Sequence, residues 1–507
     1  MNSNYLLAEI QMTRNMNVFI QFILIITIPS VFLFGFALTS NNAFALVFGL
    51  FWAGLGSLMH GINSIINYRL FSVCRLSAAF LVGFMLLGSV PTHIEHIFYP
   101  DMPSYAMSII FKPETNAENV ALVALYFIAF QLFCELFAFF DNPWWEKIIE
   151  ILRNRMINLN MSLSVEFVFL ISCSGLCLYA LVSGAVSINA SYFESNADGS
   201  NSLIASFLAQ SPPFMIILSS IMIVFYWSEN KYISYFVLFL TLPAIAVLFT
   251  DGRRGIIFSM ASVFLIWAWR YKLRISVFGI VGLIIGGLPI LHVISTFFQA
   301  ARMTHYELGG SEKGVSLLQV FAANEVLSGN YQEAAQRALT DFTVRANSMN
   351  FSIEFINNMH FDDISWGVLT LYGFLLNIPS MMWPEKLFFL AGFEKPEVYL
   401  TARLGMMMRD ESMPLPSIMF YDFGWGGIVI APLFILLVSW AMSRIGNRSK
   451  GILAVSLAIS AAILLVFNAE LNLQTAINQV RYIVMIYLFG VIINCVLEFF
   501  QLSKNTR

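Results

Sequence analysis

The sequence predicts an all-α, polytopic integral membrane protein of about 12 transmembrane helices with one large helical loop. Hydrophobic residues make up 58% of the 507 residues and charged residues only 11%. Apolar runs close to the ~20 residues that cross a bilayer recur along the chain. A chain of this composition has lipid as its main solvent, which excludes a soluble globular protein.

Twelve apolar runs come near the spanning length. In hydrocarbon the backbone must satisfy its own hydrogen bonds, and runs this rich in Leu, Ile and Phe do so as helices. The first run exceeds the roughly 7 to 15 residues of a signal-peptide core, so we interpret it as an uncleaved helix, although Ala43 and Ala45 leave a cleavage site open. The predicted spans are 18–38, 43–60, 76–91, 119–140, 163–187, 212–227, 232–250, 255–269, 275–299, 416–440, 451–468 and 482–500.

The basic residues of the short loops orient these spans, because cytoplasmic loops retain Lys and Arg. With the N-terminus inside, basic residues fall in the inside loops along the whole chain, and both termini are cytoplasmic. The early outside loops are acidic. The inside loops contain Arg69, Arg75, Lys147, Arg153, Arg155, Lys231, Arg270, Lys272, Arg274, Arg444, Arg448, Lys450, Lys504 and Arg507.

This topology divides the chain into three parts. Residues 1–299 hold spans one to nine, residues 300–415 form one large outside loop, and residues 416–507 hold spans ten to twelve. The loop is far too long for a connector, so we expect structure of its own. Tyr331 to Arg345 predicts an amphipathic helix, with Ala335, Ala338, Leu339 and Phe342 on its apolar face and an Asn330/Glu333 pair resembling a capping box.

A second apolar stretch in the loop runs from Gly367 to Met382, between Trp366 and Trp383. A full crossing there would invert every later span and move the basic residues around Arg444 to the outside. We therefore expect a helix that dips into the outer leaflet or lies on it.

Two adjacent arginines break the charge rule. Arg253 and Arg254 lie in the turn between the seventh and eighth spans, which falls outside, with Asp251 before them and glycines on both sides. Guanidinium groups match phosphate oxygens in pairs, and glycines let the backbone approach a ligand. The alternative is that the arginines reach lipid headgroups or are neutralised by Asp251. We expect an anionic ligand, because the same face offers more cations: Arg302, Arg345, Lys386, Arg403, Arg409 and Arg481.

Other polar residues lie at or near the ends of spans. Residues 409–414 and 421–427, which include Glu411 and Tyr421, fit a wall of a site or, equally, a helix cap with a small-residue packing face. Glu135 lies within the fourth span, where a carboxylate marks either function or a hydrogen-bonded structural role. His305, close to Arg302, is a candidate proton acceptor, although a lone histidine is more often structural.

Several chemistries have no motif in this sequence. There is no phosphate-binding GxxxxGK[ST], no HExxH and no GxSxG. We expect neither a metal nor a cofactor, and no Arg-rich segment is present to bind nucleic acid. The five cysteines suggest neither a disulfide framework nor a metal site: Cys74, Cys134, Cys173, Cys177 and Cys495.

Three segments carry a family resemblance: the arginine turn at 251–255, the segment 378–386 in the large loop, and residues 412–427 at the start of a late span. They resemble the Wzy-type O-antigen polymerase group, the oligosaccharide repeat unit polymerases among the GT-C-like lipid-linked glycosyltransferases. The plan of 10 to 14 helices with a large loop in the C-terminal half is also similar. Ser380 stands where the family often has an arginine, which leaves Lys386 as the only cation of its segment.

The resemblance implies a metal-independent glycosyltransferase of the bacterial inner membrane. It would transfer a growing glycan from undecaprenyl pyrophosphate to a new lipid-linked repeat unit at the periplasmic face, alongside a chain-length regulator and a repeat-unit flippase. Arg253 and Arg254 would hold the donor pyrophosphate with help from Arg409, and Glu411 or His305 would act as base. Asp251 is a further catalytic candidate, and the remaining substrate-binding candidates are Arg302, Arg345, Lys386, Arg403, Tyr421 and Arg481.

Two other functions stay open. An O-antigen ligase of similar architecture would use the same pyrophosphate chemistry and pass the finished glycan to lipid A core. A transporter of lipid-linked sugars would form no bond at all, but such proteins usually show internal repeats and small loops, and neither feature is visible here.

Overall fold

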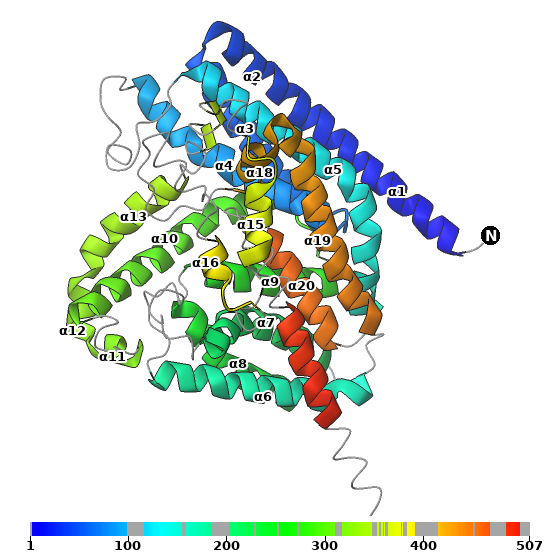
Figure 1. The fold of residues 1–507 in the computed structure, drawn as a ribbon, viewed down its shortest axis with the longest axis vertical. Helices are drawn as coiled ribbons and strands as arrows, with labels where there is room; N and C mark the ends of the chain where they lie inside the picture. Colours follow the sequence, from blue (N-terminus) through cyan, green and yellow to red (C-terminus); the bar gives the residue numbers. More distant parts are fainter. Residues whose placement is uncertain are drawn as a thin grey trace, which may run out of the picture. The chain divides into compact units, whose positions relative to one another are not determined.

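The computed structural model describes residues 3–98, 116–154, 159–183, 202–227, 230–250, 253–271, 273–309, 317–346, 352–353, 356–357, 359, 364–376, 378, 383–390, 414–449, 452–466 and 483–496. Every regular element in these ranges is a helix (Figure 1). The prediction of an all-α protein is confirmed for this part of the chain.

Each of the twelve predicted apolar runs falls on helix. The first run covers three consecutive helical pieces, α1 (Ser3–Gln21), the π-helix η1 (Phe22–Thr27) and α2 (Ile28–Ser40). The other runs fall on α3 (Ala43–Ile66), α4 (Val73–Phe98), α5 (Ala117–Asn154), α6 (Leu159–Ser183), α7 (Ser202–Tyr226), α8 (Lys231–Thr250), α9 (Arg253–Tyr271), α10 (Val277–Glu307), α18 (Leu415–Phe423) with α19 (Gly427–Ser449), α20 (Ile452–Val466) and a last helix at Ile483–Val496.

Seven helical segments in the described ranges are long and apolar enough to cross a membrane. Three further apolar helices are shorter, and the remaining two predicted runs fall on α9 and α10. The chain is therefore a helical, membrane-embedded protein. The seven segments are Gln11–Ser40, Ala43–Ile66, Val73–Phe98, Ala117–Glu150, Val165–Val182, Lys231–Leu248 and Leu415–Asn447.

The π-helical turn η1 in the first span has a local cause. Pro29 has no amide hydrogen, so it cannot donate to the carbonyl of Ile25 four residues earlier, and its ring crowds that carbonyl. The widened turn leaves the carbonyl accessible, and the indole nitrogen of Trp52 on α3 donates to it at 2.9 Å. The neighbouring helix thus replaces the hydrogen bond that proline removes.

The chain forms two compact units. Unit 1 comprises Met1–Glu146, Thr340–Ala441 and Leu465–Gln479. Unit 2 comprises Lys147–Leu339, Met442–Leu464 and Val480–Arg507.

Glycines let α3 and α4 of unit 1 pack closely together. A methyl group added at Gly54 would lie 3.1 Å from the carbonyl oxygen of Gly83, and one added at Gly83 would lie 3.0 Å from the carbonyl oxygen of Gly54. Small residues let two helix backbones approach in a membrane, where dispersion contacts drive association. This packing holds together the two helices that carry His60 and Arg75, described below.

Aromatic and hydroxyl side chains join the helices of unit 2. The ring of Phe169 on α6 packs edge-on against Phe214 on α7, with centroids 5.2 Å apart. Thr241 on α8 donates to the hydroxyl of Ser219 on α7 at 2.7 Å. A buried hydroxyl finds a partner across the helix interface in this way, since lipid offers none.

The large loop contains short helices, as expected from its length. They are α11 (Leu317–Ala322), α12 (Asn324–Gly329), α13 (Tyr331–Ala346), α15 (Val368–Leu376) and α16 (Lys386–Leu390). The predicted amphipathic helix is confirmed as α13, but its buried face runs through Ala334 and Ala338 instead of Ala335. The expected capping box is wrong as well, because the amide of Asn330 donates to the carbonyl of Val326 at 3.1 Å and Glu333 pairs with Arg337 at 2.7 Å.

Candidate functional site

The two arginines of the predicted anion site open a helix in unit 2. Arg253 and Arg254 are the first two residues of α9. The first amides of a helix have no partner within it and carry the positive end of its dipole. The backbone therefore adds to the positive charge at this point, as at other helix ends that bind phosphate. Asp251, before the helix, lies outside the described residues.

The next cation and the histidine candidate lie on α10, also in unit 2. Arg302 is exposed, whereas His305 is only 1% exposed. The ring of His305 lies 6.2 Å from that of Tyr306, centroid to centroid. The two predicted partners, one turn apart, therefore differ sharply in access to a ligand.

The other predicted site residues divide between described and undescribed segments. Arg345 lies in the last turn of α13. Tyr421 is buried in α18 and its carbonyl accepts the amide of Ser365 at 3.1 Å. Four more candidates lie outside the described residues: Arg403, Arg409, Glu411 and Arg481.

Lys386 holds together the end of a helix. Its side chain is only 6% exposed, and its ammonium group donates to the carbonyls of Leu376 and Ile378 at 2.8 Å and 2.5 Å. Leu376 is the last residue of α15. A cation at the carboxyl end of a helix meets the orphaned carbonyls and the negative end of the dipole. This geometry supports a structural role in place of the predicted contact with a ligand.

The glycine-rich segment 421–427 is a break in a membrane-entering helix. α18 ends at Phe423, and Gly424 takes a positive φ of 56° before the single 3-10 turn Gly424–Gly426. α19 then begins at Gly427, where an added methyl group would lie 2.6 Å from the backbone carbon and oxygen of Met419. Only glycine permits this close approach of backbone to backbone.

Asp422, in the same segment, caps the opposite end of α15. Its carboxylate is fully buried and accepts the backbone amides of Leu369 and Thr370 at 3.0 Å and 2.7 Å. The hydroxyls of Ser365 and Thr370 donate to it as well. A carboxylate on one helix thereby satisfies the first amides of another. Of the two predictions for residues 421–427, the geometry of Asp422 supports the helix cap.

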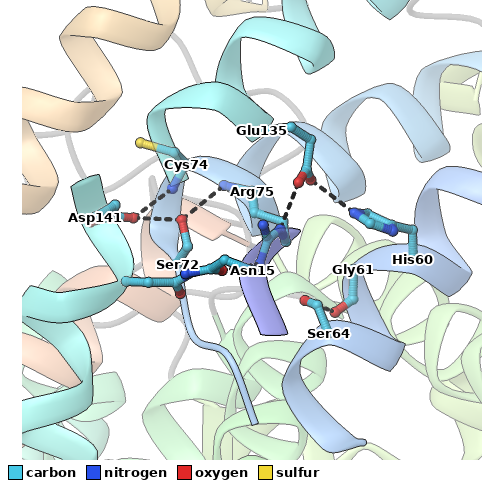
Figure 2. A network of polar contacts seen from close by, with 10 residues as sticks. Asn15, His60, Gly61, Ser64, Ser72, Cys74, Arg75, Glu135 and Asp141 are labelled. Carbon is cyan, nitrogen blue, oxygen red and sulfur yellow. Dashed lines mark hydrogen bonds and ion pairs between the residues drawn. The ribbon is translucent and has the colours of Figure 1, made fainter. Parts of the chain in front are cut away.

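A second buried polar cluster, the Glu135 network, lies among the spanning helices of unit 1. Figure 2 shows the carboxylate of Glu135 on α5 between Arg75 on α4 and His60 on α3. The Nε of Arg75 lies 2.7 Å from one carboxylate oxygen, and the Nε2 of His60 lies 2.9 Å from the other. Arg75 and Glu135 are both fully buried. The cation offsets the cost of a carboxylate inside the protein.

The Glu135 network corrects the sequence interpretation at Arg75. We assigned Arg75 to a cytoplasmic loop, but it lies in the first turn of α4 with no exposed surface. Its charge compensates Glu135, so Arg69 is the basic residue that remains in that short connection. The sequence holds only part of this signal: a mid-span carboxylate needs a cation and Arg75 borders the neighbouring predicted span, but other basic residues border spans as well.

Asp141, one to two turns further along α5, extends the polar cluster. It accepts the amide of Cys74 at 3.0 Å and the hydroxyl of Ser72 at 2.8 Å, so it caps the start of α4 (Figure 2). The hydroxyl of Ser439 on α19 also donates to Asp141 and accepts the indole N–H of Trp145 at 2.7 Å. Asp141 and Asp422 therefore have the same structural role, because each caps a helix other than its own.

The Glu135 network reaches the first helix through one amide. The side-chain amide oxygen (Oδ1) of Asn15 on α1 accepts from the guanidinium group of Arg75 at 3.4 Å and from the side-chain amide of Asn142. Four helices are joined by buried polar side chains in this way. The arrangement can hold helices in register, and neither His60 nor Asn15 was singled out by the sequence.

Metal ligation has no support within the described ranges, where no group of three or more His, Cys, Asp and Glu side chains converges. Comparisons with protein-family models, with curated proteins and with solved structures find no match to this chain. Its activity has to be inferred from its own residues.

Proposed function

We propose that the chain polymerises undecaprenyl-pyrophosphate-linked oligosaccharide repeat units into a surface polysaccharide. The observation that carries the proposal is the start of α9, where Arg253 and Arg254 are the first two residues of an apolar helix. Two guanidinium groups and a helix N-terminus at a membrane boundary suit a pyrophosphate attached to a lipid tail. The resemblance of residues 251–255 and 412–427 to Wzy-type polymerases points to the same substrate.

The proposed reaction exchanges one glycosidic bond for another. The bond between the anomeric carbon of the growing glycan and its pyrophosphate breaks, and undecaprenyl pyrophosphate leaves with the electron pair. The anomeric carbon bonds to a hydroxyl oxygen of the new repeat unit, whose proton passes to a base. Negative charge accumulates on the leaving pyrophosphate, and prepositioned cations stabilise that charge where water is excluded.

The base is proposed to be Glu411 or His305. A base must come within hydrogen-bond reach of the hydroxyl it deprotonates. His305 is 1% exposed, which disfavours direct contact with a sugar and makes Glu411 the first residue to replace. Loss of activity in Glu411→Gln with activity retained in His305→Gln would assign the role to Glu411, and the reverse pattern would assign it to His305.

The proposal includes location and partners. With both termini cytoplasmic in the bacterial inner membrane, α9 would begin at the periplasmic side, where a flippase delivers lipid-linked repeat units. A chain-length regulator would act on the same product. Fusion of a periplasm-active reporter after residue 251 tests the orientation. An inactive reporter there would show that the start of α9 faces the cytoplasm and would contradict the proposed topology.

The cellular test replaces one arginine in a strain that lacks the chromosomal gene. We expect Arg254→Ala to lower polymer formation by about 10²- to 10³-fold, the usual cost of losing one group that stabilises transition-state charge. Single repeat units should accumulate on lipid, measured by gel electrophoresis and mass spectrometry at matched membrane levels of protein. Arg337→Ala is the matched control, because it removes an exposed arginine that pairs with Glu333 on α13. Normal polymer from Arg254→Ala would refute the proposal.

A reconstituted assay separates polymerase from ligase and transporter. The purified chain in liposomes receives undecaprenyl-pyrophosphate repeat units extracted from the deletion strain, with or without lipid A core. Dimers and longer glycans without core support polymerisation. Products formed only on lipid A core would show a ligase, and movement of repeat units across the bilayer without any new bond would show a transporter.

A further inference from the structure

Helix α15 of the large loop exposes an apolar face. It is nine residues long and buries Leu369 and Gly373. Val368, Leu371 and Phe374, at intervals of three, are 40%, 50% and 48% exposed. Residues three apart lie on the same side of a helix, so these side chains form one strip. In water the strip would leave large apolar side chains uncovered.

The position of α15 relative to α19 gives its depth. The ring of Phe374 lies 6.3 Å from that of Phe434, centroid to centroid, and both residues belong to unit 1. Phe434 follows Gly427, the first residue of α19, by seven positions, which is about 10 Å along the axis at ~1.5 Å per residue. It falls inside the candidate span Leu415–Asn447.

Two tryptophans lie within that segment. Trp425 lies in the 3-10 turn before α19, and Trp440 lies nearer the carboxyl end of α19. Phe434 lies between them, closer to Trp440 in sequence. A side chain that packs on Phe434 is therefore well below the membrane surface, and α15 extends to that depth beside α19, as Figure 1 shows for the two labelled helices.

Both ends of α15 are satisfied by buried charges instead of water. Asp422 accepts the first amides, and the ammonium of Lys386 donates to the carbonyl of Leu376. A helix in an aqueous loop needs no such partners, because water completes its terminal hydrogen bonds. In hydrocarbon every backbone polar group must find a partner within the protein.

The sequence around α15 has no charge of its own. Residues 364–384 contain no Asp, Glu, Lys or Arg, with Asp363 before them and Glu385 after. The helix itself is about 14 Å long, less than half of the ~30 Å hydrocarbon thickness, so it does not cross. Lys386, the first residue of α16, donates to the carbonyl of Leu376, so α16 begins beside the end of α15.

We infer that α15 is a re-entrant helix, with the strip Val368, Leu371 and Phe374 in contact with the acyl chains of the bilayer. The lipid-facing surface of α19 continues onto this strip through the Phe374–Phe434 contact. Leu433 and Leu437 of α19 are exposed in the same way, at 43% and 57%. The inference does not depend on the proposed chemistry.

Spin labelling of the full chain tests this inference. Cys495, the one exposed cysteine of the described residues, is replaced by Ser, and a nitroxide is attached at Leu371→Cys. Leu437→Cys is the reference for lipid contact and Gln332→Cys, exposed on α13, is the reference for water. Collision rates with oxygen, which concentrates in the bilayer, and with a water-soluble nickel chelate are then compared. Val368→Cys provides a second reporter if Leu371→Cys does not fold.

The expected oxygen-to-nickel ratio at Leu371→Cys equals that at Leu437→Cys and is several-fold above that at Gln332→Cys. A ratio equal to that of Gln332→Cys would place the strip in water and overturn the inference. Low collision with both reagents, accompanied by spin–spin broadening at full labelling, would show that a second copy of the chain covers the strip, and this result would overturn it too.

Discussion

Two Arg–Glu ion pairs of equal length allow the contribution of burial to be measured directly. Arg75 and Glu135 approach to 2.7 Å between α4 and α5 with 0% of either side chain exposed. Arg337 and Glu333 also approach to 2.7 Å, on α13, with 60% and 57% exposed. The perturbation is the same in both pairs, replacement of the arginine by methionine, which keeps most of the aliphatic volume.

The expected losses of stability differ by nearly an order of magnitude. Arg75→Met leaves the carboxylate of Glu135 buried with the Nε2 of His60 at 2.9 Å as its remaining partner. Breaking a buried pair by removing one charge costs about 3–5 kcal/mol, because the other charge stays buried without its counterion. Arg337→Met should cost about 0.3–0.5 kcal/mol, since water solvates the remaining Glu333.

The double variant Arg75→Met, Glu135→Gln separates the charge from the packing. With both charges of this pair gone, neither residue leaves the other as a buried ion without its counterion. Replacing a whole buried pair is often close to neutral. We expect the double variant to recover most of the stability that Arg75→Met loses. The single variant Glu135→Gln completes the comparison. If the double variant lost as much stability as Arg75→Met and Glu135→Gln lose together, the two residues would act independently.

Unfolding of the purified chain in mixed dodecylmaltoside and SDS micelles, followed by circular dichroism, measures these free energies. From least to most destabilised, we expect the order Arg337→Met, then the double variant, then Arg75→Met. A loss in Arg75→Met no larger than that in Arg337→Met would refute the conclusion that the Glu135 network holds the spanning helices of unit 1 together.

Two further substitutions test the segment 421–427. Asp422→Ala removes the acceptor of two amides, one buried and one partly buried, and a buried amide left without a partner costs about 1–3 kcal/mol. Hydrogen exchange should therefore accelerate at Leu369 and Thr370 and stay unchanged in α3. Equal protection of these amides in the variant and the parent protein would rule out the cap. Gly427→Ala should lower the unfolding midpoint, because its methyl group would lie 2.6 Å from backbone atoms of Met419 that cannot move independently. Gly175→Ala in α6 is the control, because its methyl group would meet nothing within 4 Å and should leave the midpoint unchanged. Equal midpoints for the two alanine variants would contradict the close-packed break.

The helices were predictable from sequence because each follows from local composition. A run of apolar residues near the spanning length has one backbone solution in lipid, and each predicted run falls on helix. The start of α18 at Leu415 agrees with the predicted boundary at residue 416. Charge alone was less informative, since Arg75 was counted with the loop although its side chain is buried in an ion pair.

The partners of the polar residues were not predictable, because they depend on helices that are distant in sequence. The sequence identified Glu135 as costly but gave no means of choosing among cations, and His60 carried no motif. The charge and predicted side of Lys386 indicate a ligand contact, whereas its ammonium group donates to the carbonyl at the end of α15. The pattern of residues 421–427 predicts a wall of a site or a helix cap, but the helix that Asp422 caps lies in another part of the chain.

The helix caps formed across the chain impose an order on biosynthesis. The amide of Cys74 depends on Asp141, 67 residues later, and Asp141 depends on Ser439, another 298 residues later. Because synthesis proceeds from the N-terminus, the first helices are made long before Ser439, whose hydroxyl donates to Asp141. A nascent chain that ends before α19 therefore lacks the Ser439 hydroxyl that donates to Asp141, and only the carboxyl-terminal part of the same polypeptide supplies it.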